Sequence, residues 1–167
     1  MDCPGNCLYF GRVTEDRDWF DEVAFPVLLR AARSAYGSAI RRALADVGCD
    51  DMPRNGSFVI GAIARTGAPL SEIIKGLRVS KQAAGQLVDT LVTREYLDRS
   101  PDPEDRRRLT ITLTERGRAA AAVIRSVIER VDADLAGRVG AEYVAHTRAT
   151  LAALIEGNTG GDERDRG

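Results

Sequence analysis

The sequence of 167 residues predicts a mainly α-helical protein with one small β-hairpin. Apolar residues recur at close to a 3.6-residue period between Trp19 and Val47, which indicates a long helix. They alternate with polar residues at 109–113, which indicates a strand. Two further helical stripes follow residue 118. We therefore expect helices to build most of the core and the hairpin to be a local addition.

These patterns divide the chain into five consecutive segments. They are a flexible N-terminal segment at 1–17, a first long helix at 18–48, a compact region of short helices and the hairpin at 54–118, two C-terminal helices at 119–156 and a disordered tail at 157–167.

The first helix carries a proline near its start. Pro26 lacks a backbone N–H and fits best in the first turn of a helix, so the segment is expected to begin a second time there. Gly48 and the stretch 50–53, which contains Pro53, end the helix.

Two short helices in the middle of the chain predict a helix-turn-helix. A helix at 57–65 comes first, Ser71 is the expected N-cap of the next helix, and Ser80 caps a helix that runs to about Glu95. This last helix would expose residues that are polar or small and suit base edges in a major groove: Ser80, Lys81, Gln82, Gly85, Gln86, Asp89 and Thr90. An ordinary helical hairpin with a solvated face is the alternative that this segment alone leaves open.

The residues that follow favour the DNA-binding interpretation. Two strands, at 96–99 and 109–113, enclose a loop stiffened by Pro101 and Pro103. In that loop Asp105 can hold Arg107 outward toward a minor groove, where the negative potential is deepest. The neighbouring Arg106 and Arg108 would face phosphates. The loop is therefore predicted to be a wing beside a recognition helix.

The charge distribution agrees with a local footprint for a polyanion. The net charge is −1, yet residues 54–118 hold 12 Lys and Arg against 8 Asp and Glu. A charge run is also the ordinary property of a solvated face, so this observation only supports the motif.

The stretch VSKQAAGQLVDTLVTREYLDRSPDPEDRRRLTITLTERG, residues 79–117, resembles the core of the MarR family, the multiple antibiotic resistance regulators. The wing signature of that family appears as Asp105, Arg107, Leu113 and Thr114, followed by Glu115-Arg116-Gly117. Weaker agreement extends over about 20–156. The resemblance implies an obligate homodimer with interleaved N- and C-terminal helices. It also implies binding to pseudo-palindromic double-stranded DNA operators, usually as a repressor, with release by small aromatic ligands.

Three positions depart from the family pattern. Arg78 stands where the family often has glycine, and Gly85 stands where threonine or serine is common. Gln86 replaces a frequent basic residue, which makes adenine a plausible target through its N6/N7 edge. These departures leave the function in place and the operator sequence open.

The C-terminal stripes predict a dimer interface, because the compact region has its own small core. The residues expected there are Val139, Tyr143, Leu151, Leu154 and Ile155. Packing of these helices onto the first helix of the same chain is the alternative.

A pocket for an aromatic ligand is expected where the first helix meets the winged region. Its candidate lining is aromatic, although aromatic residues at helical spacing are commonly core: Trp19, Phe20, Phe25, Tyr36 and Phe58.

Other chemistry finds little support in the sequence. His146 is the only histidine, and no nucleophile–histidine arrangement or phosphate-binding glycine loop is present, so we predict no enzymatic activity. A Cys3His zinc site from Cys3, Cys7, Cys49 and His146 lacks paired ligand spacing, so neither a metal nor another cofactor is expected.

The prediction is therefore a cytoplasmic, ligand-released, dimeric DNA-binding repressor, with no membrane partner. Two alternatives stay open: a winged-helix module that binds proteins and has lost DNA binding, and a regulator switched by the thiols of Cys3 and Cys7.

Overall fold

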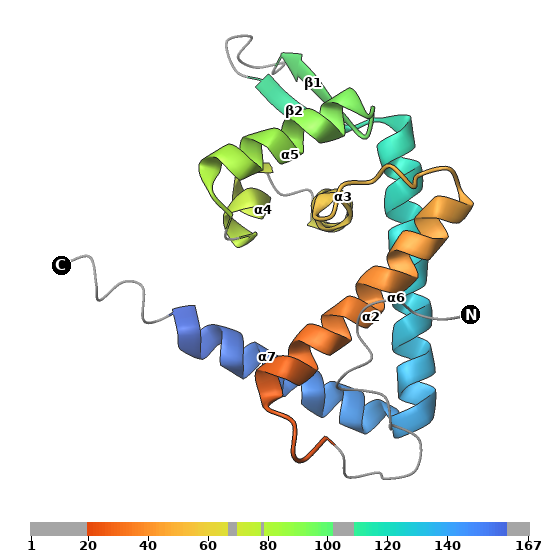
Figure 1. Cartoon of the computed structure of the whole chain (residues 1–167), viewed down its shortest axis with the longest axis vertical. Helices are drawn as coiled ribbons and strands as arrows, with labels where there is room; N and C mark the ends of the chain where they lie inside the picture. Colours follow the sequence, from red (N-terminus) through yellow and green to blue (C-terminus); the bar gives the residue numbers. More distant parts are fainter. Residues whose placement is uncertain (1–19, 67–69, 78, 102–108, 160–167) are drawn as a thin grey trace, which may run out of the picture. The chain divides into compact units, whose positions relative to one another are not determined.

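The computed structural model describes residues 20–66, 70–77, 79–101 and 109–159 (Figure 1). The elements in chain order are α2 (Phe25–Asp46), α3 (Gly56–Thr66), α4 (Leu70–Gly76), α5 (Lys81–Thr93), β1 (Leu97–Pro101), β2 (Leu109–Leu113), α6 (Glu115–Val139) and α7 (Ala141–Thr159). The predicted fold class, mainly α with a small β-hairpin, is confirmed. The chain divides into two compact units, one ending at Ser38 and one beginning at Ala39.

The first helix starts later than the predicted residue 18. Residues 20–22 form a turn, in which the Val23 N–H donates to the Phe20 carbonyl at 3.2 Å, and α2 begins only at Phe25. Pro26 is the second residue of α2, where its missing N–H leaves no helical carbonyl unpaired. The predicted second start at Pro26 thus lies one residue after the actual start of the helix at Phe25.

A Schellman motif ends α2. Gly48 adopts a left-handed conformation, with φ of 73°, and its N–H donates to the Ala45 carbonyl at 3.1 Å. The Cys49 N–H donates to the Leu44 carbonyl at 2.8 Å, and the side chains of both residues are buried. Because the left-handed conformation suits glycine, Gly48 marks this end in the sequence.

The two caps predicted for the short helices had different outcomes. Ser80 caps α5, and its hydroxyl accepts from the Ala83 N–H at 3.2 Å, as predicted. Ser71 is the second residue of α4 and not its cap, because that helix already begins at Leu70. A serine at the second position of a helix is difficult to distinguish from a cap by residue type alone.

The recognition helix candidate, α5, ends at Thr93, two residues before its predicted end at about Glu95. A second Schellman motif closes it: the Glu95 N–H donates to the Val92 carbonyl and the Tyr96 N–H to the Leu91 carbonyl, both at 2.9 Å. Glu95 has φ of 58°, the left-handed region. The chain turns there and enters β1.

The hairpin pairs β1 and β2 antiparallel, with Leu97 opposite Leu113 and Arg99 opposite Ile111. Side chains alternate between the faces of a strand, so Leu97, Arg99, Ile111 and Leu113 share one face and Asp98 lies on the other. Leu97 is 1% exposed, so the face of the hairpin that carries Leu97 lies against the core.

The core of the second unit joins the end of α2, the helices α3, α4 and α5, the hairpin and the first half of α6. Its fully buried side chains are Leu44, Val59, Ile60, Leu91, Tyr96, Leu97, Ala120, Ile124 and Val127. The buried half of α6 thus anchors the short helices and the hairpin. This arrangement fixes where α5 presents its opposite face.

The C-terminal helices extend beyond their predicted bounds. The boundary predicted at 118 falls inside α6, which begins at Glu115, and α7 continues to Thr159, into the tail predicted as disordered from 157. Residues 160–167 and the N-terminal segment 1–17 lie outside the described residues. Arg148 pairs with Asp132 at 2.6 Å and links α7 to α6.

Candidate nucleic-acid interface

The exposed face of α5 carries most of the predicted DNA-contacting residues. Ala84, Val88 and Leu91 are buried on one side of the helix. The opposite side leaves the predicted residues in solvent: Ser80, Lys81, Gln82, Gly85 and Gln86. Because the apolar side is packed into the core and Ser80 caps the N-terminus, the polar side is presented from a fixed support.

Thr90 and Gly85 differ from the other predicted positions in their surroundings. Thr90 is half-buried, and its hydroxyl donates to the Gln86 carbonyl at 2.7 Å, so its oxygen remains available only as an acceptor. A Cβ added to Gly85 would meet no atom within 4 Å. The fold therefore does not require glycine at this position.

An ion pair links α5 to the hairpin. The Arg99 guanidinium of β1 donates to the Asp89 carboxylate of α5, and both side chains are exposed. Asp89 was predicted on the exposed face of α5, but its pairing with Arg99 was not predicted. The alternation of β1 puts Arg99 on the face that Leu97 turns toward the core, which is the one sequence signal for the pairing.

The wing tip lies outside the described residues. This applies to Asp105, Arg106, Arg107 and Arg108, whose predicted roles stay predictions. The two strands that lead to and from the tip are described, and their register is regular up to Pro101 opposite Leu109.

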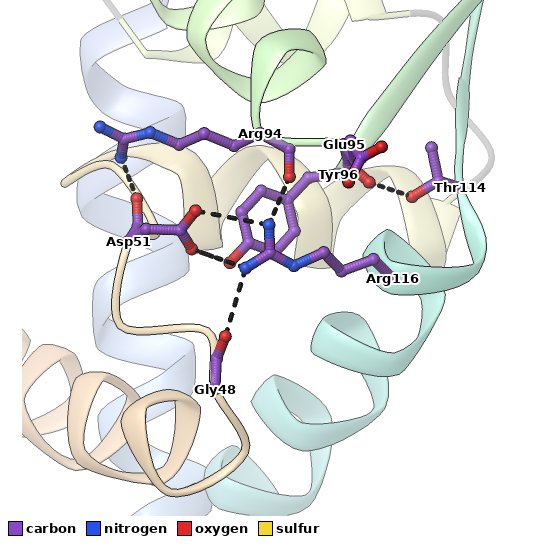
Figure 2. Close-up of polar contacts among 7 residues, drawn as sticks. All are labelled: Gly48, Asp51, Arg94, Glu95, Tyr96, Thr114 and Arg116. Carbon is purple, nitrogen blue, oxygen red and sulfur yellow. Dashed lines mark hydrogen bonds and ion pairs between the residues drawn. The ribbon is translucent and has the colours of Figure 1, made fainter.

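A polar cluster at the C-terminal end of α5 connects three segments that are distant in the sequence (Figure 2). The Arg116 Nη2 lies 2.9 Å from Asp51 Oδ1, and the Arg116 Nη1 donates to the Arg94 carbonyl at 2.6 Å. The same guanidinium donates to the Gly48 carbonyl at 3.2 Å and lies over the Tyr96 ring, 4.3 Å from its centroid. One arginine thus joins the end of α2, the end of α5 and the start of α6.

Asp51 accepts hydrogen bonds from two further residues of this cluster. The Tyr96 hydroxyl donates to its carboxylate, and the Arg94 guanidinium donates to its backbone carbonyl. The Tyr96 hydrogen bond lowers the pKa of the Asp51 carboxyl below its ordinary 3.8; burial opposes the shift and the Arg116 charge adds to it. Burial, followed by the hydrogen bond to Asp51, raises the pKa of Tyr96 well above its ordinary value. Asp51 is therefore ionised and Tyr96 neutral at pH 7.

The residues after β2 have identifiable structural roles. Thr114 caps α6, since its hydroxyl accepts from the Gly117 N–H at 2.9 Å, and the same hydroxyl donates to the Glu95 carbonyl. A Cβ on Gly117 would lie 2.1 Å from the Tyr96 carbonyl oxygen. This close approach explains why glycine follows Thr114 by three residues.

Comparison with known proteins agrees with this arrangement. Residues 50–108, which include α3, α4, α5 and β1, match the family model described as MarR family. Over these residues the chain is similar to the MarR family. The resemblance proposed from residues 79–117 is thereby confirmed.

One curated relative is the HTH-type transcriptional repressor NicR of Pseudomonas putida, 37% identical over 73 residues. The aligned stretch covers 42% of this chain and 46% of NicR, so it spans about half the length of that relative.

Solved MarR-family structures share the fold over most of the chain. The S. aureus MepR–DNA complex has a TM-score of 0.65 at 19% identity and is matched over 81% of this chain and 99% of its own. The repressor CouR, bound to a 23-mer DNA duplex, has a TM-score of 0.61 at 20% identity, with 85% and 99% covered. Reduced MarR from E. coli has a TM-score of 0.60 at 20% identity, with 80% and 97% covered. At these identities the likeness shows that the chain shares their fold.

The aromatic residues predicted to line a ligand pocket fall in both compact units. Phe20 and Phe25 are about half exposed and Tyr36 is partly buried in the first unit, and Phe58 is about half exposed in the second. Trp19 lies outside the described residues. The pocket therefore stays a prediction.

The residues predicted for the dimer interface lie on α6 and α7. Val139, Tyr143, Leu154 and Ile155 are exposed, Tyr143 to 68% and Ile155 to 65%, and Leu151 is partly buried. These exposures are compatible with the predicted dimer interface, which stays a prediction.

Cysteine exposure, metal ligation and membrane spanning are described for the same ranges of the chain. Cys49 is 6% exposed, and Cys3 and Cys7 lie outside the described residues. Within the described ranges, no group of three or more His, Cys, Asp and Glu residues is placed to hold a metal ion. No helix in the same ranges is long and apolar enough to span a bilayer.

Proposed function

We propose that this protein is a dimeric, sequence-specific DNA-binding transcription regulator of the MarR type that acts as a repressor. The observation that carries the proposal is the exposed polar face of α5, supported on its other side by the core. NicR is named a repressor, and the MepR and CouR structures contain DNA, which supports the same role for this chain.

The chemistry of the α5 face suits base readout in the major groove. Gln82 and Gln86 lie one turn apart on the helix, and a glutamine amide can bind an adenine bidentately through N6 and N7. Lys81, in the first turn, can bind guanine or a phosphate. Gly85 lies between Gln82 and Gln86 in the sequence, and a Cβ at this position would meet no atom within 4 Å. The open space permits close approach of a sugar or a base edge.

The recognition helix and the wing are expected to respond differently to substitution. Gln82→Ala and Gln86→Ala should each lower affinity for a selected duplex by about 1–3 kcal/mol and leave affinity for a scrambled duplex nearly unchanged. Arg107→Ala should weaken binding to both duplexes and reduce the salt slope by about one, because a groove and phosphate contact carries little sequence information.

The test is a titration of each variant against a duplex selected by the wild type from a randomised pool and against its scrambled counterpart. Equal losses on both duplexes for the glutamine variants would exclude base readout by α5. Wild-type affinity of Arg107→Ala for both duplexes would exclude the wing contact.

The exposed apolar side chains of α6 and α7 support a homodimer. Leu154 and Ile155 are more than half exposed, so burial against a second chain would remove apolar surface from water without repacking the core. A two-fold dimer would also place two copies of α5 on a pseudo-palindromic operator.

Leu154→Asp and Ile155→Asp should therefore convert the dimer into a folded monomer that no longer holds the operator. Ala149→Asp adds the same charge on another side of α7 and should leave the dimer intact. Sedimentation at micromolar concentration measures the outcome. A monomeric wild type, or equal dissociation by Ala149→Asp, would contradict the proposed interface.

Release by a small aromatic ligand is the finer part of the proposal. Aromatic acids of the salicylate class should lower operator affinity by binding a DNA-incompetent conformation preferentially. Titration of the operator complex with a panel of such acids tests this. Unchanged affinity across the panel would indicate another form of control.

A further inference from the structure

Asp89 places a negative charge on the face that α5 would present to DNA. It follows Gln82 by seven residues and Gln86 by three, so the three side chains lie along one stripe of the helix. The Asp89 side chain is 63% exposed. A carboxylate on such a stripe repels phosphates unless a cation compensates it.

Arg99 supplies that cation from the hairpin. It lies in β1 directly opposite Ile111, on the strand face that carries the buried Leu97, and its guanidinium donates to the Asp89 carboxylate. An exposed pair of this kind contributes little to the stability of a fold. Its main consequences are therefore the relative position of two elements and the local charge.

The pair connects the two elements that the proposed function assigns to DNA. One partner belongs to the recognition helix and the other to the strand at the base of the wing. While Asp89 holds Arg99, the guanidinium is directed toward a protein carboxylate and is less available to a phosphate. If it were released, the interface would have one more mobile cation and one fewer fixed contact between helix and hairpin.

We propose that Asp89 is a specificity-determining positioning residue: through Arg99 it fixes the hairpin against the recognition helix and limits binding to random DNA. This inference rests on the proposed DNA-binding function. The pair adds no base contact of its own, and it raises specificity by lowering affinity for the wrong sequences.

The first experiment compares Asp89→Asn with Asp98→Asn on a selected duplex and on its scrambled counterpart. Asp98 is the matched control, because it is an exposed aspartate one residue before Arg99 on the opposite strand face. Asp89→Asn should bind the scrambled duplex more tightly and steepen its salt slope by about 0.9, which is about a threefold additional change for a fourfold change in salt. The ratio of selected to scrambled affinity should fall at least about threefold, and Asp98→Asn should leave that ratio near the wild-type value.

A charge swap distinguishes the effect of the ion pair from the effect of a change in net charge. Asp89→Arg combined with Arg99→Asp keeps the net charge and restores an ion pair with reversed polarity. Its ratio of selected to scrambled affinity should recover to above that of Asp89→Asn. A merely local charge effect would not produce this recovery.

The outcomes separate the inference from the proposed function. If the wild type prefers its selected duplex but Asp89→Asn and Asp98→Asn give the same ratio, or the swap does not recover specificity, the positioning role is overturned and DNA binding stands. If the wild type binds neither duplex in a salt-dependent way, both proposals are overturned.

Discussion

Gly117→Ala is expected to destabilise the protein by at least about 2 kcal/mol. A Cβ at this position would lie 2.1 Å from the Tyr96 carbonyl oxygen, which is a backbone atom and cannot rotate away. That carbonyl also accepts from the Thr114 N–H at 3.3 Å, so moving it disturbs the start of α6 and the end of α5 together. Urea unfolding followed by circular dichroism measures the change.

Gly137→Ala is the matched control in the same helix. A Cβ there would meet no atom within 4 Å, so alanine should stabilise the isolated chain by up to about 1 kcal/mol through its higher helix propensity. A Gly117→Ala protein as stable as the wild type would contradict the close approach of α6 to Tyr96.

Asp51→Ala should lower the free energy of unfolding by about 1–3 kcal/mol. The substitution removes the acceptor of the Tyr96 hydroxyl and the carboxylate partner of Arg116, and Tyr96 belongs to the buried core. Asp50→Ala is the control, since it removes an exposed carboxylate one residue away. Denaturant titration of both variants checks the prediction; equal effects would mean that the cluster adds nothing specific.

The stabilising effect of the Asp51 carboxylate is expected to depend on pH. The pKa of Asp51 is lowered in the folded state from its ordinary 3.8, so its stabilising effect is present above that value and is lost as pH falls through the folded pKa. The stability difference between the wild type and Asp51→Asn should therefore shrink between about pH 5 and pH 2. A difference that stays constant over this range would show that the ionised carboxylate is not the source.

The sequence predicted the elements that follow from local patterns. The alternation of Leu109, Ile111 and Leu113 located β2, and Ser80 located the start of α5. The exposed positions of α5 followed from the same helical period, because burial of one face determines the other.

The ends of elements were predicted less well where the deciding interaction is not local. α5 was extended to Glu95 because a non-glycine residue in a left-handed cap gives no clear sequence signal, whereas Gly48 does. The start at 18 was too early because Pro26 can stand at more than one position near a helix start.

The polar contacts that hold α5 in place were not predicted, for a similar reason. Arg116 and Asp51 are 65 residues apart, and only the packing of α6 against α3 and the end of α5 brings them together. The Asp89–Arg99 pair is closer in sequence, but it depends on how the hairpin lies against α5. The periodicity of residues within one element predicts neither of these two contacts.

The central claim is that the exposed face of α5 reads a DNA sequence, and one titration tests it most directly. Wild-type protein is measured against the duplex that it selects from a randomised pool and against a scrambled duplex of the same composition, each at several salt concentrations. If α5 reads the sequence, log affinity should fall linearly with log salt for both duplexes, and the selected duplex should bind at least about 1,000-fold more tightly at each concentration. Equal affinity for the two duplexes, or binding that does not respond to salt, would contradict it.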